Sequence, residues 1–365
     1  MHLYLHVPFC ARRCSYCDFA IAVRREVPAA QYVAAVLREW AQQQGHAAWT
    51  AAPRLDSVYF GGGTPSRLPP AAIAELLARL CADRSLAPAA EITLEANPED
   101  VTPEAAAVWH AAGVNRLSLG VQSLDDRVLA WMHRTHDARA VPAAVAAARA
   151  AGFDNISFDL IFGLPAALER DWSADLAGAL ALEPEHLSLY GLTTEPHTPL
   201  ARWTDRGLVR PADEQRYATE YLEAHAALVG AGLEHYEVSN AGRPGRRARH
   251  NSAYWRRAPY LGLGPSAHSA AGGERWWNLR EWVAYARAVA GGGSWVAGRE
   301  APDAAAVRLE ELYLGLRTVE GVAVAFVPEA TVTNWVRSGW AAVSGGRVSL
   351  TAEGWLRVDA LVAAV

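Results

Sequence analysis

Three cysteines near the start of the chain, Cys10, Cys14 and Cys17, have the type and spacing needed to hold a metal centre. Their spacing is C-x3-C-x2-C, and they follow an apolar run, Leu3–Val7, that Pro8 ends. Three thiolates on one loop can each hold one corner of a cubane [4Fe-4S] cluster, which leaves the fourth iron without a protein ligand. An open coordination position allows a metal centre to do chemistry.

Two other chemistries also use closely spaced cysteines. Structural zinc usually takes four Cys or His ligands in paired spacing, and His6 could supply a fourth ligand, although it lies well back along the predicted strand. A disulfide is disfavoured because we expect no secretion signal in this sequence. The remaining cysteine, Cys81, lies on the apolar side of a predicted helix and is interpreted as an ordinary buried residue.

Alternating strand and helix patterns position this loop. The β-rich runs are Leu3–Val7, Leu55–Phe60, Glu91–Ala96, Arg116–Val121, Ile156–Phe162 and His186–Leu192. The helical patterns are Ala29–Gln44, Pro70–Cys81, Pro103–Ala112, Asp125–His133, Arg139–Ala151 and Asp171–Leu182. Such alternation predicts an α/β fold with a parallel sheet and right-handed crossovers. Six units are too few for a closed eight-stranded barrel, so we expect an open, partial (β/α)6 TIM-like barrel, with a further strand at Glu234–Ser239.

Unusual residues gather just after each predicted strand. The cysteines follow the first strand, and the later strand ends carry the sequences GGGTP, EANP, GVQS, GLP and YGLT. The carboxyl ends of parallel strands are where such folds place their sites. We therefore expect these loops to form one site with the cysteines.

The alternation stops near Gly242, and three domains are predicted. Residues 1–240 form the barrel, residues 241–298 a basic and aromatic bridging segment that contains HNSAYW, and residues 299–365 a small C-terminal domain. Within the bridging segment, Leu261–Ala271 is predicted to be a loop. The C-terminal order of helix, helix, strand and helix is compatible with a winged-helix-like unit.

Composition excludes several classes of protein. All 34 basic residues are arginine, so the chain has neither the lysine of a Walker A loop nor the Schiff-base lysine of a pyridoxal-phosphate enzyme. A net charge of −5 argues against general nucleic-acid binding. No apolar stretch is long enough to span a membrane, and we expect a cytoplasmic, reducing location.

With these motifs the chain resembles the radical S-adenosylmethionine (SAM) superfamily, whose signature is C-x3-C-x2-C with an aromatic residue, here Tyr16, before the last cysteine. The resemblance implies a [4Fe-4S] cluster on Cys10, Cys14 and Cys17, whose unique iron chelates SAM, and a reductant for that cluster. It also implies a set of SAM-contacting residues: Tyr4, Tyr16, Gly62, Gly63, Thr64, Glu95, Gln122, Arg134, Asp159 and Thr193.

The matching stretches are closest to the coproporphyrinogen III oxidase-like group, and include HVPFCARRCSYCDF, YFGGGTPS, FDLIFGLP and HNSAYW. Two functions compete within this group. HemN-type oxidases decarboxylate porphyrinogen propionates, whereas HemW-type chaperones bind haem and transfer it. The oxidase has a further cysteine where this chain has Phe19, and a longer N-terminal segment. HNSAYW matches the H-N-x-x-Y-W of the chaperones, so the resemblance favours a haem chaperone, and whether SAM is cleaved stays open.

A haem chaperone implies a haem site and recipient haemoproteins, for which membrane-associated respiratory enzymes are one candidate class. His250 and Tyr254 can ligate iron, and Tyr254 and Trp255 offer flat apolar faces to a macrocycle. His268 is a second candidate ligand. Five arginines could pair with the propionates: Arg246, Arg247, Arg249, Arg256 and Arg257.

Overall fold

A computed structural model describes residues 1–46, 49 and 52–365 of the chain. The centre of its main sheet is a row of parallel strands that lie side by side in chain order. These strands are β1 (His2–Val7), β4 (Arg54–Gly62), β5 (Ser85–Ala96), β6 (Arg116–Gln122), β7 (Ile156–Phe162) and β8 (His186–Gly191). The six strands and the parallel sheet expected from the sequence are therefore confirmed.

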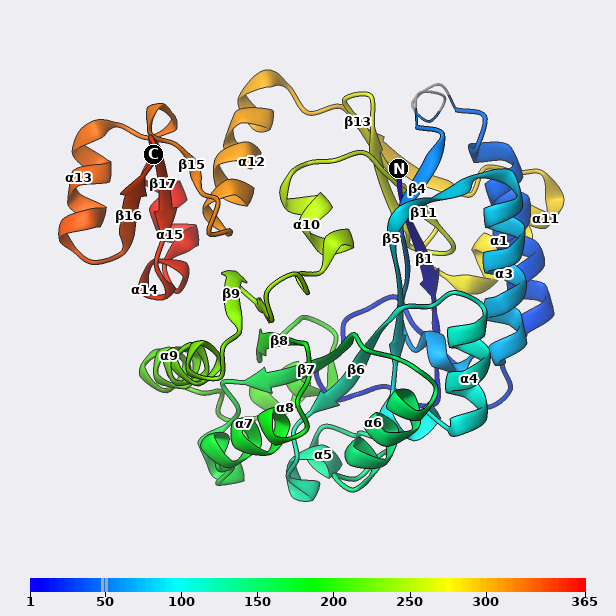
Figure 1. Ribbon diagram of the computed structural model, residues 1–365, viewed down its shortest axis with the longest axis horizontal. Coiled ribbons are helices and arrows are strands. Elements are labelled where there is room, and N and C mark those ends of the chain that lie inside the picture. Colours follow the sequence, from blue (N-terminus) through cyan, green and yellow to red (C-terminus); the bar gives the residue numbers. More distant parts are fainter. Residues whose placement is uncertain (47–48, 50–51) are drawn as a thin grey trace.

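Helices cover the outer side of the curved sheet (Figure 1). They are α1 (Ala29–Gln43), α3 (Pro70–Asp83), α4 (Pro103–Ala111), α5 (Asp126–Trp131), α6 (Ala140–Ala150) and α7 (Trp172–Ala181). Their starts follow from local chemistry: Pro70 and Pro103 occupy first helical positions, and the Thr102 and Asp171 side chains accept hydrogen bonds from backbone N–H groups three residues later. Each helix matches its predicted range to within about two residues.

The core lies between this sheet and the helices, which explains the apolar strand sequences. In β7, ISFDLIF, every residue is buried except Asp159, which is partly exposed. Continuous apolar runs are expected when a parallel sheet is buried on both faces. Asp159 is the exception because its carboxylate faces a cavity.

Both edges of the parallel row are extended by later strands. Next to β8 lie β10 (Asn240–Gly242) and β9 (Glu234–Glu237), both antiparallel. Next to β1 lies β11 (Tyr260–Leu263), which is parallel, followed by antiparallel β12 (His268–Ala271), β13 (Glu274–Asn278) and β14 (Val296–Glu300). Over the described ranges, twelve strands thus form one mixed sheet.

The predicted loop over Leu261–Ala271 is wrong, because β11 and β12 occupy its two ends. The physical reason is tertiary: β1 offers an unpaired edge, and residues 260–263 satisfy its backbone groups in parallel register with residues 2–5. The expected strand at Glu234–Ser239 does form, although it runs antiparallel to its neighbour.

The remaining helices are α8 (Pro199–Asp205), α9 (Glu214–Gly230), α10 (Arg249–Trp255) and α11 (Trp282–Gly291). The C-terminal part contains α12 (Ala304–Leu316), β15 (Val322–Ala323), α13 (Glu329–Arg337), β16 (Ala341–Ser344), β17 (Arg347–Leu350), α14 (Ala352–Trp355) and α15 (Val358–Ala363). Its strands form a small antiparallel sheet in the order β15-β17-β16, drawn in orange and red in Figure 1. None of the described helices is both long and apolar enough to cross a membrane.

Candidate functional site

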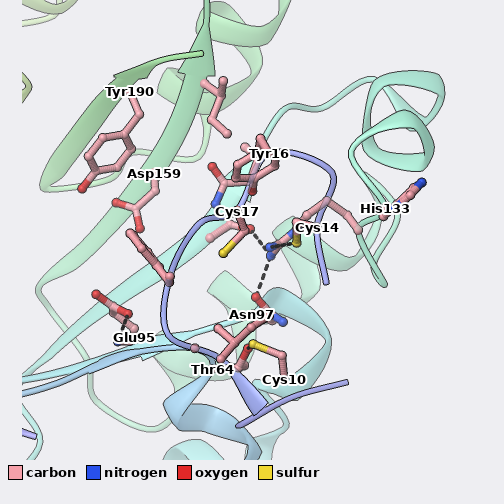
Figure 2. A pocket seen from close by; sticks show the side chains of 18 of the residues that line it. Cys10, Cys14, Tyr16, Cys17, Thr64, Glu95, Asn97, His133, Asp159 and Tyr190 are labelled. Atoms are coloured by element: carbon pink, nitrogen blue, oxygen red, sulfur yellow. Dashed lines mark hydrogen bonds between the residues drawn. The ribbon is translucent and has the colours of Figure 1, made fainter. Parts of the chain in front are cut away.

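The three cysteines line one cavity of about 450 Å³ at the carboxyl ends of the parallel strands. Their loop is closed at its base by a pair of short parallel strands, β2 (Phe9–Cys10) and β3 (Ala22–Val23). All three cysteines are free thiols. Figure 2 shows them around the same space, with Thr64 and Asn97 beside Cys10 and Tyr16 beside Cys17.

Buried hydrogen bonds fix the position of the cysteine loop. The imidazole of His6 contacts the Ala20 carbonyl through Nε2 at 2.9 Å and the Tyr4 hydroxyl through Nδ1 at 3.1 Å. Burial lowers the pKa of His6 to about 4, so the ring is neutral near pH 7 and can donate one proton. One ring nitrogen thus holds the loop and the other contacts Tyr4 in β1, and His6 does not line the cavity that contains the cysteines.

The surroundings of the sulfurs suit a bound metal cluster. The Thr64 hydroxyl donates to Cys10 Sγ at 3.4 Å, and Arg134 Nη1 donates to Cys14 Sγ at 3.6 Å. Burial raises the pKa of Cys10, and raises that of Cys17 to about 11, so thiolates here need a cation to stabilise them. No three His, Cys, Asp or Glu side chains in the described ranges converge enough to bind a single metal ion. This finding is compatible with a cubane cluster, because the three cysteines of such a site each bind a different iron.

Two carboxylates face the cysteines across the cavity (Figure 2). Glu95, at the end of β5, accepts hydrogen bonds from the Tyr59 hydroxyl at 2.8 Å and from the Gly62 N–H at 3.1 Å. Asp159, from β7, accepts from the Ser118 hydroxyl at 3.3 Å. Burial raises the pKa of Glu95 to about 7 and that of Asp159 to about 6. When ionised, both carboxylates can accept hydrogen bonds from the hydroxyl or ammonium groups of a ligand.

The third side of the cavity carries an amide and a guanidinium. Arg134 Nη2 donates to Asn97 Oδ1 at 2.6 Å and to the Gly120 carbonyl at 2.9 Å, which fixes the plane of its guanidinium. Gln122 is the last residue of β6 and has a φ of 67°, a left-handed conformation that is uncommon outside glycine. Its Oε1 atom is buried and has no hydrogen-bond partner among the described residues. A ligand with a suitably placed donor would satisfy it.

The glycines after β4 are required by close packing. A Cβ atom on Gly63 would lie 2.8 Å from the Pro8 carbonyl group and 3.0 Å from Cys10 Sγ. Gly62 has a φ of 114°, and its N–H donates to Glu95. Gly63 therefore lets the cysteine loop approach β4, and the N–H group of Gly62 holds the Glu95 carboxylate in place. Both glycines thus have a role in packing the site, in addition to any contact with a ligand.

Most predicted cluster and SAM residues line this cavity; they are Cys10, Cys14, Tyr16, Cys17, Gly62, Gly63, Thr64, Glu95, Gln122, Arg134, Asp159 and Thr193. Tyr4 does not line it, since its hydroxyl contacts His6. Asn97, Ser118 and Tyr190 line the cavity as well and were not among the predicted SAM contacts, although Asn97 and Tyr190 belong to the strand-end sequences EANP and YGLT. Each lies in or just after a parallel strand, which is the signal that could have identified them.

A second cavity of about 970 Å³ adjoins the first. The two share Asp18, Phe19, Gly62 and Glu95 in their walls. Phe19 is 60% exposed, although its side chain is a large apolar one. Tyr254 and His268 line the second cavity, and its volume is at the upper end of the range for cofactor sites, about 300–1,000 Å³.

The other predicted haem residues lie elsewhere. His250, in α10, is only 1% exposed and lines neither cavity. Trp255 lies under the guanidinium of Arg317, 4.9 Å from its ring centre. The five arginines suggested for propionates all contact other parts of the protein; their partners are Asp154, Glu234, Ala89, Glu320 and the pair Glu310 and Glu311. Of the five, only Arg257 lines the second cavity.

Comparison with known proteins places the chain in a family. Residues 4–176 match the radical SAM superfamily. A protein of Mycobacterium tuberculosis (strain H37Rv) named heme chaperone HemW is 38% identical over 363 residues, which cover 99% of this chain and 93% of that protein. The chain belongs to the HemW family. A HemW protein of Bacillus subtilis is 33% identical over 322 residues, covering 87% of this chain and 84% of its own.

The chain shares its fold with a solved oxidase. Coproporphyrinogen III oxidase (HemN) from Escherichia coli superposes with a TM-score of 0.80 over 99% of this chain and 88% of that one, at 23% sequence identity. Radical SAM membership implies a [4Fe-4S] cluster and SAM as cofactors, and the three cysteines, the unpartnered amide oxygen and the opposed carboxylates fit both. The partial-barrel α/β fold of the radical SAM type expected from the sequence is thus confirmed.

Proposed function

We propose that this protein binds haem beside a [4Fe-4S] and SAM site and passes the haem to recipient haemoproteins. The observation that carries this proposal is the 38% identity, along 99% of the chain, to a protein named heme chaperone HemW. A cavity of about 970 Å³ that shares a wall with the cysteine cavity supports it, because it offers room for a macrocycle beside the cluster. Recipients include the class of membrane-associated respiratory enzymes, and an external reductant serves the cluster.

In this proposal Cys10, Cys14 and Cys17 hold the cluster. When bound, the cluster supplies a low-potential electron and one iron with an open position for the amino and carboxylate groups of SAM. Arg134 is held in a fixed plane by Asn97, so it can pair with the SAM carboxylate.

The other side chains act on the rest of SAM. Glu95 and Asp159 accept hydrogen bonds from its ammonium or ribose hydroxyls, and Gln122 offers a free amide oxygen. Tyr16 packs beside the cysteine cavity and excludes water from it.

The cluster ligands are tested by the Cys10→Ala, Cys14→Ala, Cys17→Ala triple variant. We expect it to lose the brown chromophore and the iron content after anaerobic reconstitution. Cys81→Ala is the matched control, since Cys81 lies in α3 and lines neither cavity. A triple variant that keeps a full cluster would disprove the ligand assignment.

Oxidative decarboxylation of coproporphyrinogen III is the alternative function, favoured by the fold shared with HemN. Phe19 opposes it, because a phenyl ring at the wall between the two cavities cannot bind metal as a further cysteine would. The discriminating experiment incubates the reconstituted protein anaerobically with coproporphyrinogen III, SAM and a reductant, beside a haem titration. We expect a Soret shift with haem and no decarboxylation. Product formation at ordinary enzyme rates, without haem binding, would favour the oxidase.

A further inference from the structure

We infer that His268, and not His250, provides the axial imidazole for the iron of haem, which then occupies the second cavity. The inference rests on the proposed function, and it names the side chain and the position through which that function operates. It comes from comparing the two histidines that the sequence offers as ligands, because their surroundings in the fold are opposite.

His268 lies at the start of β12 and lines the second cavity. It is exposed, and its ring stacks on that of Trp277, its register partner in β13, with centroids 5.8 Å apart and planes at 24°. Within the described part of the chain neither of its ring nitrogens has a hydrogen-bond partner. Desolvation of the ring by the surrounding protein lowers the pKa of His268, so the ring is mostly neutral near pH 7, as an iron ligand must be. The ring is therefore oriented by Trp277 and free to bind a metal.

His250 has neither property. Its Nδ1 contacts the Ser57 hydroxyl at 2.7 Å, and its Nε2 contacts the Tyr254 hydroxyl at 2.7 Å. The ring also stacks on Tyr59 at 5.0 Å. Binding iron would break one of these two hydrogen bonds and expose a side chain that is only 1% exposed. The packing instead makes His250 a positioning residue for Tyr59, whose hydroxyl holds Glu95 at 2.8 Å.

The walls of the second cavity suit a macrocycle with carboxylates on its rim. Tyr254 and Tyr260 contribute aromatic surface, with their rings in edge contact at 4.7 Å. Arg280 lines the cavity and donates to the Asp18 carbonyl, and it has no carboxylate partner in the described ranges. Arg257 and Arg275, by contrast, are paired with Glu310. Arg280 is therefore the cation available to a propionate.

The position of this cavity would place a bound haem next to the cysteine cavity. The cavity lies between β12, β13 and α12, and it shares Phe19 and Glu95 with the cysteine cavity. α12 contributes Val307, Glu310 and Leu314 to its far wall. A haem held by His268 would thus lie between the sheet and the C-terminal part of the chain.

The test is an anaerobic haem titration of the full-length, cluster-reconstituted protein, followed by the Soret band and by electron paramagnetic resonance of the ferric form. We expect the His268→Ala variant to bind haem at least about tenfold more weakly and to lose the spectral signature of imidazole ligation. Free imidazole should restore that signature in the His268→Gly variant, which a merely structural defect would not allow. Arg280→Ala should weaken binding and leave the Soret position unchanged.

His250→Ala is the rival variant and His225→Ala the control, since His225 lines neither cavity. We expect both to keep the signature of imidazole ligation. If His250→Ala removes it and His268→Ala does not, or if His268→Ala binds with unchanged affinity and spectrum, the inference is overturned while the proposed function stands. If the unaltered protein binds no haem, the proposed function fails, and the inference fails with it.

Discussion

Glu95 should make the folded protein less stable as the pH rises, and Glu95→Gln should remove that effect. Burial raises the pKa of Glu95 from its ordinary value of 4.5 to about 7. At about 1.4 kcal/mol for each pKa unit, ionising this carboxyl in the folded protein costs about 3 kcal/mol. The cost is somewhat smaller where water in the cavity solvates the carboxylate.

The sign follows from proton binding. Below about pH 4.5 the carboxyl is protonated in both the folded and the unfolded chain, so it contributes nothing to the pH dependence. Between about 4.5 and 7 the folded protein binds more protons, so stability falls as the pH rises, and the loss is complete above about pH 7. The amide of Glu95→Gln does not titrate and can still contact Tyr59, so the variant should lose less stability over this range.

The assay is urea unfolding of the cluster-free, reduced protein at pH 5 and pH 7.5, followed by the fluorescence of its 14 tryptophans. The free energy of unfolding of Glu95→Gln, relative to the unaltered protein, should rise by about 2 to 3 kcal/mol between the two pH values. Glu329→Gln, an exposed carboxylate at the start of α13, controls for the loss of one charge. An equal pH dependence in the unaltered protein and in Glu95→Gln would refute the reasoning.

Two further predictions concern packing around the site and the core. Gly63→Ala should destabilise the protein by about 1 to 3 kcal/mol and reduce iron incorporation, because its methyl group would lie 2.8 Å from the Pro8 carbonyl group. Gly230→Ala, with no atom within 4 Å of the new methyl group, should do neither, and equal effects of the two on iron content would contradict the explanation. Arg170→Ala should lower the free energy of unfolding by about 3 to 5 kcal/mol, because it removes a buried guanidinium that lies 2.6 Å from Glu220 and 3.7 Å from Asp175, and leaves Glu220 only the more exposed Arg216 as a cationic partner. Arg139→Ala is the control: it removes an exposed ion pair with Asp137 and should leave the urea midpoint unchanged. If Arg170→Ala lowers the free energy of unfolding no more than this control does, the buried pair has no structural role.

Local patterns were enough to predict the barrel, because the information lies within short stretches of sequence. The period of apolar residues separates strands from helices, and Thr102 and Asp171 cap helices through contacts only three residues long. The topology then brings the strand ends together without further information, since parallel strands all point the same way. This is why residues as distant as Cys10 and Thr193 could be assigned to one cavity.

The edges of the sheet could not be predicted in the same way. β11 has no local signal strong enough to mark it as a strand, and it forms because β1 presents an edge about 250 residues earlier in the chain. The same pairing brings His268 to the wall of the second cavity, which residues 18–20 also line.

By itself, the sequence determined the cysteine spacing, the positions of the six parallel strands along the chain and the residues at their ends. Only the tertiary structure decided which side chains remain available to a ligand. His250 stands in the more telling motif, yet Ser57, 193 residues away, and Tyr254 occupy both of its ring nitrogens. His268 stands in an unremarkable stretch, yet it faces an open cavity. Spacing along a chain specifies which chemistry is possible, whereas the availability of a lone pair depends on neighbours that only the folded chain brings into contact.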